Sequence, residues 1–281
     1  MSFIDELQKL PPLREIITEH KLSAQKKFGQ NFILDLNLTR RIARTAKPLN
    51  ECPIIEIGPG PGGLTRALFL EGATNVIAIE KDPRCLEALK SLQDVVGDRL
   101  RLIEGDALEI DYNQICPGPK KIVANLPYNI STPLLINWLK HMDSFLSLTL
   151  LFQKEVATRI TAKPHTKEYG RLSILSQLLS NPTLAFDIAP TAFVPAPKVI
   201  STLVHFVTRK ESPESSLVDI LENLTSAAFN QRRKMLRGSL KLVHPDIIKI
   251  LDDLNIDPVL RAENLSPDDF LNIAKVLQLL R

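Results

Sequence analysis

The sequence predicts an α/β fold with a mostly parallel sheet of seven strands, followed by a small domain made only of helices. Two observations predict it. Short apolar runs alternate with helical patterns up to about residue 208, which is typical of parallel strands covered by helices on both faces. From residue 215 onward, only the 3.6-residue spacing of helices remains.

The expected strands are short and rich in Ile, Leu and Val. They cover residues 54–57, 76–79, 100–103, 121–124, 146–152, 184–188 and 202–207. Helices are expected at 64–70, 83–92, 133–139, 154–162 and 172–180. Before the first strand, residues 1–20 are expected to form a helical or loose arm, broken by Pro11 and Pro12.

A charged segment at residues 209–217, RKESPESSL, separates the two patterns. It contains Pro213, which the interiors of helices and strands rarely accommodate, so we interpret it as a linker. The helical pattern beyond it ends with an expected helix at 270–280. We therefore predict two domains, residues 1–208 and residues 215–281.

The composition is that of a globular protein and argues against several classes. Hydrophobic residues make up 44% of the 281 residues and charged residues 24%, so the chain can bury its own core. We expect no membrane span, because no run of about 18 apolar residues occurs. The N-terminus does not resemble a secretory signal, and the three widely spaced cysteines indicate reduced thiols, as in a cytoplasmic protein. Neither HExxH nor CxxC occurs, so we expect no metal site.

The net charge of +3 is too small to indicate a nucleic-acid-binding protein by itself. The distribution is more informative. One basic segment, residues 21–50, contains a single acid and seven basic residues: Lys21, Lys26, Lys27, Arg40, Arg41, Arg44 and Lys47. Another, residues 226–245, has no acid and contains Arg232, Arg233, Lys234, Arg237 and Lys241. Such runs are often solvated helix faces, so they leave the function open.

A glycine-rich loop, GPGPGG, joins the first strand to the first helix. Gly58 and Gly60 lack a Cβ, so the backbone can approach a ligand there. The pattern alone is weak, because nucleotide-dependent dehydrogenases share it and a turn without a ligand can also use it. However, Pro59 and Pro61 remove N–H donors that a pyrophosphate needs. The loop therefore favours a cofactor without phosphate.

Two carboxylates follow the next two strands. Glu80 ends the second strand, where a carboxylate can accept both hydroxyls of a ribose. Asp106 follows the third strand, where it can meet the amino edge of an adenine. Alone, Glu80 can be a solvated strand end and Asp106 a turn or cap residue. Together with the loop they indicate S-adenosylmethionine, which has ribose and adenine but no phosphate.

The stretch VANLPYNIST follows the fourth strand. Asn125 is expected at the carboxyl edge of the sheet, where open α/β sheets bind ligands. Pro127 holds Leu126 extended, and Thr132 with Pro133 predicts the start of a helix. The loop is therefore expected to be stiff. The alternative is an Asx-type turn with a buried tyrosine.

Such a loop suits methyl transfer to the exocyclic amino group of an adenine. This nitrogen is a poor nucleophile because its lone pair is delocalised into the ring. The Asn125 side-chain oxygen and the carbonyl of Leu126 or Pro127 can accept its hydrogens and favour a pyramidal nitrogen, while Tyr128 stacks on the base. Catalysis then depends on positioning and electrostatics, without a strong base.

In this order and spacing, the motifs resemble those of the ribosomal RNA small subunit adenine N6-dimethyltransferase family, of the KsgA/RsmA type. The matching stretches are KKFGQNFILD (26–35), EIGPGPGGLT (56–65), AIEKDPRC (78–85), EGDAL (104–108), NLPYNIST (125–132), KEYGRLSIL (167–175) and FVPAPKVIST (193–202). The resemblance implies a Rossmann-like S-adenosylmethionine methyltransferase fold.

The resemblance also implies site residues. The cofactor contacts are Asn31, Ile33, Gly58, Glu80, Asp106 and Asn125, and Phe193 joins Asn125, Leu126, Pro127 and Tyr128 as a residue of the catalytic site. Phe193 can stack on the target adenine opposite Tyr128, or can simply pack in the core. The family usually has leucine where Ile33 stands, and its loop often carries Pro-Gly-Ser where this chain has residues 164–166.

By resemblance, the substrate is two adjacent adenosines in the hairpin loop near the 3′ end of 16S rRNA, each dimethylated, within the 30S subunit or its precursor. The protein would act as a cytoplasmic monomer and take part in small-subunit biogenesis. The basic segment 226–245 would contact RNA phosphates, and the arm at 21–47 would close over cofactor and substrate.

Three alternatives remain. A methyltransferase of the same fold can act on large-subunit rRNA, and a ribosome-assembly or transcription-accessory protein can keep the fold without the reaction. The intact set of Gly58, Glu80, Asp106, Asn125 and Tyr128 argues against loss of activity. A nicotinamide dehydrogenase is disfavoured by the prolines of the glycine loop.

Overall fold

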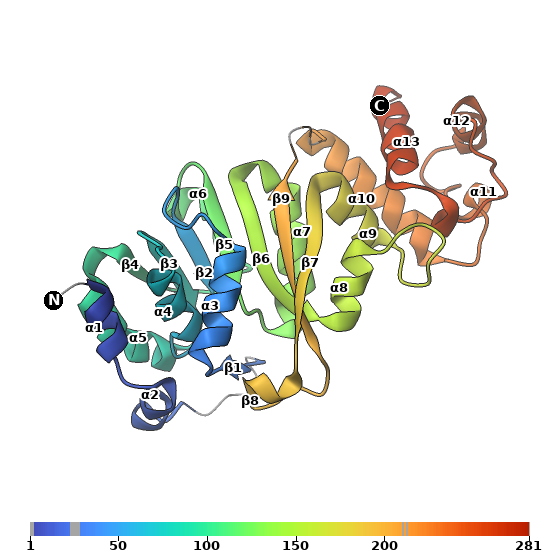
Figure 1. Cartoon of the computed structure of the whole chain (residues 1–281). Helices are drawn as coiled ribbons and strands as arrows, with labels where there is room; N and C mark the ends of the chain where they lie inside the picture. Colours follow the sequence, from blue (N-terminus) through green and yellow to red (C-terminus); the bar gives the residue numbers. More distant parts are fainter. Residues whose placement is uncertain (1–2, 23–28, 210, 212, 281) are drawn as a thin grey trace. The chain divides into compact units, whose positions relative to one another are not determined.

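The computed structural model describes residues 3–22, 29–209, 211 and 213–280. Lys26 and Lys27, two of the predicted basic residues, lie outside this part of the chain. Strands and helices alternate over the first two thirds, and helices follow (Figure 1). The strands are β1 (Phe32–Ile33), β2 (Ile54–Ile57), β3 (Val76–Glu80), β4 (Leu100–Glu104), β5 (Lys120–Ala124), β6 (Phe145–Gln153), β7 (Ser180–Ile188), β8 (Phe193–Val194) and β9 (Ser201–Thr208).

The helices that were predicted begin and end within a few residues of the expected positions, except at the start of α7. The helices are α1 (Phe3–Lys9), α2 (Leu13–Glu19), α3 (Leu36–Thr45), α4 (Gly63–Leu70), α5 (Pro83–Val96), α6 (Tyr112–Ile115), α7 (Tyr128–Lys140), α8 (Lys154–Thr161), α9 (Arg171–Leu179), α10 (Ser215–Asn230), α11 (Leu236–Ser239), α12 (Ile247–Asp253) and α13 (Pro267–Leu279). Pro11 and Pro12 separate α1 from α2, as expected for residues that cannot continue a helix.

Seven strands form one sheet in the order β4-β3-β2-β5-β6-β9-β7, so the predicted α/β fold is confirmed. Neighbouring strands from β4 to β6 are parallel. All four residues of β2 are buried, which explains why this strand is a continuous apolar run apart from Glu56. The chain leaves β2 toward β3 on one side and later adds β5 on the other side. The gap between β2 and β5 is therefore the switch point where sheets of this kind bind ligands.

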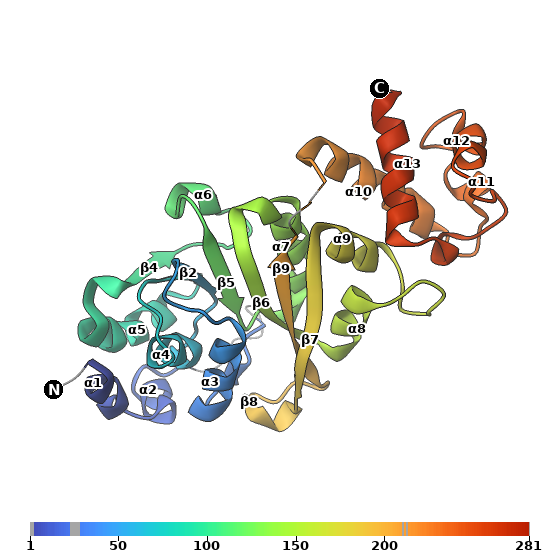
Figure 2. The same ribbon diagram turned by 45° about the horizontal axis from the view of Figure 1, so that its top comes forward.

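The register brings the loops of interest to one edge. Ile57, the last residue of β2, lies opposite Ile79 of β3 and Ala124 of β5. The residues that follow these three strands therefore emerge at the same edge of the sheet. Figure 2 shows β5 and β6 side by side, as the strand order requires. Helices α4 and α5 connect β2, β3 and β4 and pack on one face of the sheet, as right-handed crossovers require.

Several features were not predicted, among them the short helix α6 between β4 and β5. Strands β1 and β8 form a separate antiparallel pair, in which Phe32 lies opposite Val194 and Ile33 opposite Phe193. Helix α3 follows β1, and its N-terminus is capped by Asp35, whose side chain accepts the Asn37 N–H at 2.8 Å. This aspartate is the single acid of the basic segment at 21–50, so it has a structural role.

The chain divides into two compact units, residues 1–135 with 144–154 and 184–206, and residues 136–143 with 155–183 and 207–281. The second unit therefore holds α8 and α9 as well as α10 to α13. Its interior includes Tyr169, Phe229 and Phe270, whose rings contact one another in sequence. The predicted boundary between residues 208 and 215 stays a prediction, since this grouping follows contacts and not chain order.

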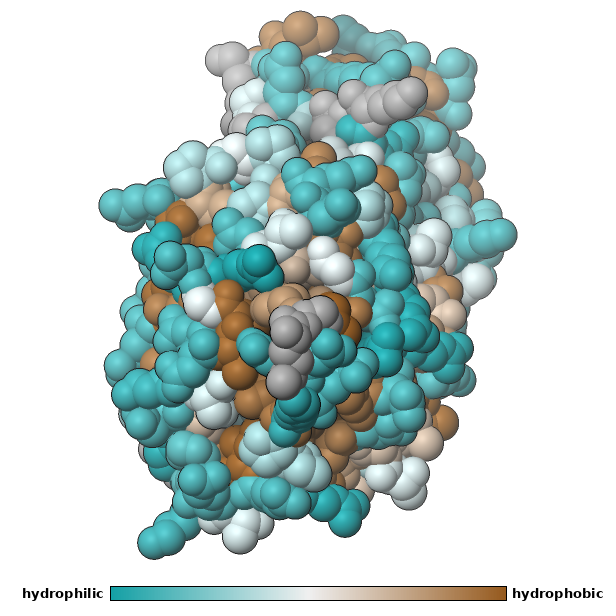
Figure 3. Space-filling model, turned by 60° about the vertical axis from the view of Figure 1, so that its left-hand side comes forward, coloured by the Kyte–Doolittle hydropathy of each residue, from teal (hydrophilic) through white to brown (hydrophobic). Residues whose placement is uncertain are grey.

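Polar side chains cover most of the face shown in Figure 3, with apolar residues in small groups between them. Among the helices of the described residues, none is both long and apolar enough to cross a membrane.

Candidate active site

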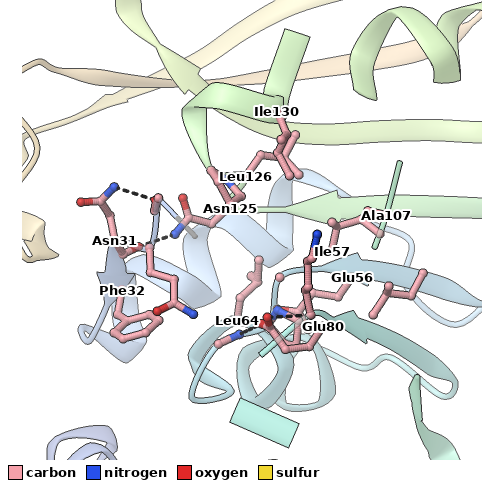
Figure 4. A pocket seen from close by; sticks show the side chains of 18 of the residues that line it. Asn31, Phe32, Glu56, Ile57, Leu64, Glu80, Ala107, Asn125, Leu126 and Ile130 are labelled. Carbon is pink, nitrogen blue, oxygen red and sulfur yellow. Dashed lines mark hydrogen bonds between the residues drawn. The ribbon is translucent and has the colours of Figure 1, made fainter. Parts of the chain in front are cut away.

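A cavity opens at the carboxyl edge of the sheet, at the switch point between β2 and β5 (Figure 4). Residues 29–33, the glycine loop, and the loops after β3, β4 and β5 line it, all within the first unit. It brings together all seven predicted cofactor contacts: Asn31, Ile33, Gly58, Gly60, Glu80, Asp106 and Asn125. Of the predicted catalytic residues it also includes Leu126, Pro127 and Tyr128, but not Phe193.

Positions 58–62 of the glycine loop have no backbone donor to spare for a phosphate. Pro59 and Pro61 carry no N–H. Of the four glycine N–H groups, three are bonded within the protein: Gly58 to the Ile79 carbonyl at 2.9 Å, Gly60 to Glu80 Oε2 at 3.1 Å, and Gly62 to the Pro59 carbonyl at 3.0 Å. The fourth glycine, Gly63, is the first residue of α4. Gly58, Gly60 and Gly62 therefore offer a pyrophosphate no more free N–H groups than the two prolines do.

Glycine is required at Gly60. Its φ of +55° lies in the left-handed region, and a Cβ there would come 2.9 Å from the Phe32 ring. The position therefore keeps the loop close against the wall of the cavity.

The Glu80 carboxylate is oriented by backbone donors. Oε2 accepts the Gly60 N–H, and Oε1 accepts the N–H groups of Lys81 and Asp82, both at 2.9 Å. The side chain is buried, and this burial raises its pKa although the three N–H groups favour the charged form. Oε1 already accepts two N–H groups, whereas Oε2 accepts one and keeps an acceptor position that can serve a ribose hydroxyl.

Asp106 sits at the neighbouring strand end. Its Oδ1 accepts the Leu108 N–H at 3.0 Å, and its Oδ2 lies 2.6 Å from the Lys81 ammonium. The Lys81 contact is the main reason that its pKa is lowered. The carboxylate is therefore ionised and able to accept a hydrogen bond from a ligand at neutral pH.

The orientation of the Asn125 amide follows from its contact with the chain near β1. Asn125 Nδ2 donates to the Asn31 carbonyl at 2.9 Å, and Asn31 Nδ2 donates to the Gly29 carbonyl at 3.2 Å (Figure 4). A carbonyl oxygen can only accept, so this contact fixes which end of the Asn125 amide is the nitrogen. Oδ1 is left as the acceptor of this side chain.

Tyr128 is held by its hydroxyl, which lies 2.6 Å from Ser201 Oγ. Burial raises the pKa of this phenol, so it stays neutral. One expectation was wrong here: helix α7 begins at Tyr128, and Thr132 and Pro133 lie inside it. The Pro127 carbonyl accepts the Ile130 N–H at 3.1 Å, which starts the helix earlier, and Pro133 removes only one hydrogen bond close to the helix start.

Comparison with known proteins agrees with this geometry. The family model "Ribosomal RNA adenine dimethylase" matches residues 21–279. The chain belongs to the ribosomal RNA adenine dimethylase family. It is 51% identical to "Ribosomal RNA small subunit methyltransferase A" of Xanthobacter autotrophicus, over 100% of this chain and 98% of that protein. It is 52% identical to the protein of the same name from Allorhizobium ampelinum, over 96% and 99% of the two chains.

Two solved structures resemble the fold closely. A dimethyladenosine transferase from Plasmodium falciparum superposes with a TM-score of 0.72 at 27% identity, covering 85% of this chain and 94% of that chain. The 23S rRNA methyltransferase ErmE gives 0.68 at 24% identity, covering 88% and 100%. The second likeness shows the fold alone.

The adenine dimethylase family uses S-adenosylmethionine, and the residues of the cavity fit this cofactor. Glu80 and Asp106 offer acceptors suited to its ribose hydroxyls and adenine amino group. The glycine loop offers close approach, and its positions 58–62 have no free N–H for a phosphate. Among the described residues, no group of three or more His, Cys, Asp or Glu side chains is placed to hold a metal ion.

Phe193 does not line the cavity with the other predicted residues. It is 2% exposed and packs in the hydrophobic core, beside Ile33 in the β1–β8 pair. As it lies here, the ring has the core-packing role that the sequence left open. Its proposed stacking on a target adenine stays a prediction.

Sequence reasoning did not single out Glu56. This residue is 1% exposed in β2, lines the cavity, and its Oε2 has no hydrogen-bond partner. Burial raises its pKa to about 8. The available signal was a charged residue in an otherwise apolar run of four, IIEI, which a buried parallel strand rarely contains.

Proposed function

We propose that this enzyme transfers methyl groups to the N6 amino groups of two adjacent adenosines in the 3′-terminal hairpin loop of 16S rRNA. Each adenosine receives two methyl groups, and the substrate is the 30S subunit or its precursor, so the reaction belongs to small-subunit biogenesis. The names of the bacterial relatives support the small subunit as the target. The observation that carries the proposal is the fixed amide of Asn125 at a cavity that suits S-adenosylmethionine.

The target amino group needs two hydrogen-bond acceptors at fixed positions. When bound, S-adenosylmethionine supplies an electrophilic methyl group on a sulfonium. Asn125 Oδ1 accepts one hydrogen of the target nitrogen, because Asn31 already holds the Nδ2 end of the amide. An acceptor there favours a pyramidal nitrogen whose lone pair is available for attack, and this is electrostatic stabilisation by a preorganised dipole.

We assign the second acceptor to the Leu126 carbonyl. The sequence left Leu126 and Pro127 as alternatives. The Pro127 carbonyl accepts the Ile130 N–H at 3.1 Å and so belongs to the start of α7. The Leu126 side chain is 2% exposed, and this anchor holds its peptide group at the end of β5. Held by these two acceptors, the target nitrogen would receive the methyl group that the bound cofactor supplies, and the proton that it loses would pass to solvent.

Tyr128 is proposed to stack on the target adenine. Its ring is half-buried at the cavity, and the Ser201 contact limits its rotation. A base that leaves its RNA stack regains part of the lost stacking energy on such a ring. Phe193 as the partner on the opposite face requires a shift of the β1–β8 pair, because its ring is buried in the core.

The second unit is proposed to contact rRNA, with the helical residues 215–281 as a separate domain. Arg233, Lys234, Arg237 and Lys241 are exposed there and suit phosphate contacts. Arg232 differs, since it pairs with Glu263 at 2.9 Å and donates to the Thr166 carbonyl. It therefore stabilises the unit itself.

We also infer that the enzyme is a monomer in the cytoplasm, where its three free cysteines stay reduced.

The test is transfer of labelled methyl groups to immature 30S particles that lack the modification, followed by mapping of methylated adenosines in both rRNAs. The proposal expects label in two adjacent adenosines of the 3′-terminal hairpin of 16S rRNA, four methyl groups per particle. Label in 23S rRNA would instead support the large-subunit alternative. Cofactor binding without label in either rRNA would support an assembly protein that has lost the reaction.

A further inference from the structure

Lys81 is a charged residue of the cavity to which the mechanism above gives no role. It directly follows Glu80 at the end of β3, and its Nζ lies 2.6 Å from Asp106 Oδ2. The ion pair therefore links the ends of two neighbouring parallel strands. The Lys81 side chain is 60% exposed and that of Asp106 21%, so the pair stands at the open side of the site.

The residue serves both acidic groups of the cofactor site. Its backbone N–H donates to Glu80 Oε1 at 2.9 Å, while its ammonium bonds Asp106. A single residue thus connects the carboxylate suited to the ribose with the carboxylate suited to the adenine. This double contact distinguishes Lys81 from a lysine that forms an ordinary surface ion pair.

Asp106 is fixed at both of its oxygens. Oδ1 accepts the Leu108 N–H at 3.0 Å and Oδ2 accepts the Lys81 ammonium. Each carboxylate oxygen has two acceptor positions, so one remains on each after these contacts. Two donors from different segments fix the plane of the carboxylate, and hence the directions of the remaining acceptor positions.

The charges around the cavity also require a cation. The carboxylates Glu80 and Asp106 both line it, and among the described lining residues Lys81 is the sole Lys or Arg. Removal of its charge would leave the Leu108 N–H as the remaining donor to the Asp106 carboxylate. A carboxylate in that position is freer to rotate toward solvent.

We propose that Lys81 is a positioning residue for the cofactor, which acts by holding the Asp106 carboxylate in the plane required to accept the exocyclic amino group of the cofactor's adenine. This rests on the assignment of Asp106 to the adenine edge. Lys81 does not touch the reacting atoms. Its contribution is preorganisation, because the free enzyme already holds the acceptor in place and binding need not order it.

The test measures binding of S-adenosylhomocysteine by calorimetry to the full chain, without RNA. Lys81→Met removes the charge but keeps an unbranched side chain, and we expect about five- to tenfold weaker binding. Lys81→Arg keeps the charge and should bind within about twofold of the wild type. The matched control is Lys90→Met on α5, which removes another exposed lysine from an ion pair, with Glu87, outside the cavity. It should leave binding unchanged.

A double-mutant cycle decides whether Lys81 acts through Asp106. In an Asp106→Asn background, Lys81→Met should weaken binding by less than about twofold, because the group that Lys81 positions has lost its charge. An equal loss in both backgrounds, or wild-type affinity of Lys81→Met, would overturn the proposal. Lys81→Gln replaces Lys81→Met if thermal unfolding shows that the methionine variant is not folded. Failure of the rRNA target would leave these outcomes unaffected, since no RNA is present.

Discussion

The two halves of the cavity are held in place differently. In the cofactor half, Glu80 is oriented by the backbone N–H groups of Gly60, Lys81 and Asp82, which lie 20, 1 and 2 residues away in the chain. The other half of the cavity is formed by residues 125–128, the NLPY half. There the Asn125 amide is oriented by the Asn31 carbonyl, 94 residues away in the chain, and the Tyr128 hydroxyl by the Ser201 side chain, 73 residues away. Glu80 is thus held by backbone groups near it in the chain, whereas Asn125 and Tyr128 depend on distant segments.

This difference separates the two tasks of the enzyme. A carboxylate that accepts hydrogen bonds from three backbone N–H groups stays in place as long as the strands are folded. Such a group suits the repeated binding of one cofactor. An amide held by a single contact has one acceptor in a defined direction, and that acceptor matters only when a target nitrogen is present. The halves should therefore respond differently to substitution, in binding on one side and in rate on the other.

The largest effect is expected for Asn125→Ala, which removes the acceptor of the NLPY half. Loss of one preorganised group at the reacting atoms should lower the single-turnover rate about 100-fold or more. The affinity for S-adenosylhomocysteine should fall only modestly. Rates of methyl transfer to immature 30S particles measure the effect, with Asn37→Ala on α3 as a control outside the cavity. A near-normal rate would refute the role of the amide.

Glu80→Gln should act mainly on the cofactor half. The amide nitrogen cannot accept from the backbone N–H groups that now bond the carboxylate, and it cannot accept a hydroxyl from the ribose. We expect a loss of about 2 kcal/mol, or roughly 30-fold, in cofactor affinity. Calorimetric titration measures it, and Glu87→Gln on the exposed face of α5 is the matched control. An unchanged affinity would contradict the predicted ribose contact.

Glu56 differs from Glu80 within the cofactor half, because its Oε2 has no hydrogen-bond partner. Its folded pKa of about 8 lies above the value in the unfolded chain, about 4.3, so unfolding releases a proton between these values. The contribution of the neutral Glu56 side chain to the free energy of unfolding is therefore largest below about pH 4, and it is lost as the pH rises toward 8.

Glu56→Gln removes this titration. We expect the gain in the free energy of unfolding over the wild type to be larger at pH 8 than at pH 5 by about 3 kcal/mol, because most of the interval between the two pKa values lies between these two pH values. Chemical denaturation at the two pH values measures the difference. A gain of the same size at both values would show that the carboxyl is not neutral in the fold.

The smallest effect is expected for Ser201→Ala, which removes the partner of the Tyr128 hydroxyl. Loss of one hydrogen bond, about 1 kcal/mol, should slow transfer about fivefold without a change in cofactor affinity. Tyr128→Phe should have an effect of similar size, because it keeps the stacking ring and removes the same contact. A much larger loss for Tyr128→Phe would indicate a direct role of the hydroxyl in transfer.

The same contrast explains how far sequence could predict this molecule. The seven strands, the glycine loop, Glu80 and Asp106 were predictable because each depends on a local pattern, such as an apolar run or a residue at a strand end. The β1–β8 pair has two residues in each strand, too few to show a periodicity.

The parts that sequence missed depend on contacts across the fold. The early start of α7 follows from the Pro127–Ile130 turn, which outweighs the usual preference of proline for the first turn. The contact of Asn125 with the Asn31 carbonyl could not be inferred, because no motif connects a side chain to a backbone group so far away. Phe193 was expected at the site from its motif, but its burial is a property of the packed core.

The most direct test of the separation of tasks is one paired measurement on Asn125→Ala and Glu80→Gln. For each variant, the dissociation constant of S-adenosylhomocysteine and the single-turnover rate at saturating S-adenosylmethionine are measured on the same preparation. The account predicts that Asn125→Ala loses rate while its affinity stays within about fivefold of the wild type, and that Glu80→Gln loses affinity while its saturated rate stays within about fivefold. Equal losses of rate and affinity in both variants would contradict it.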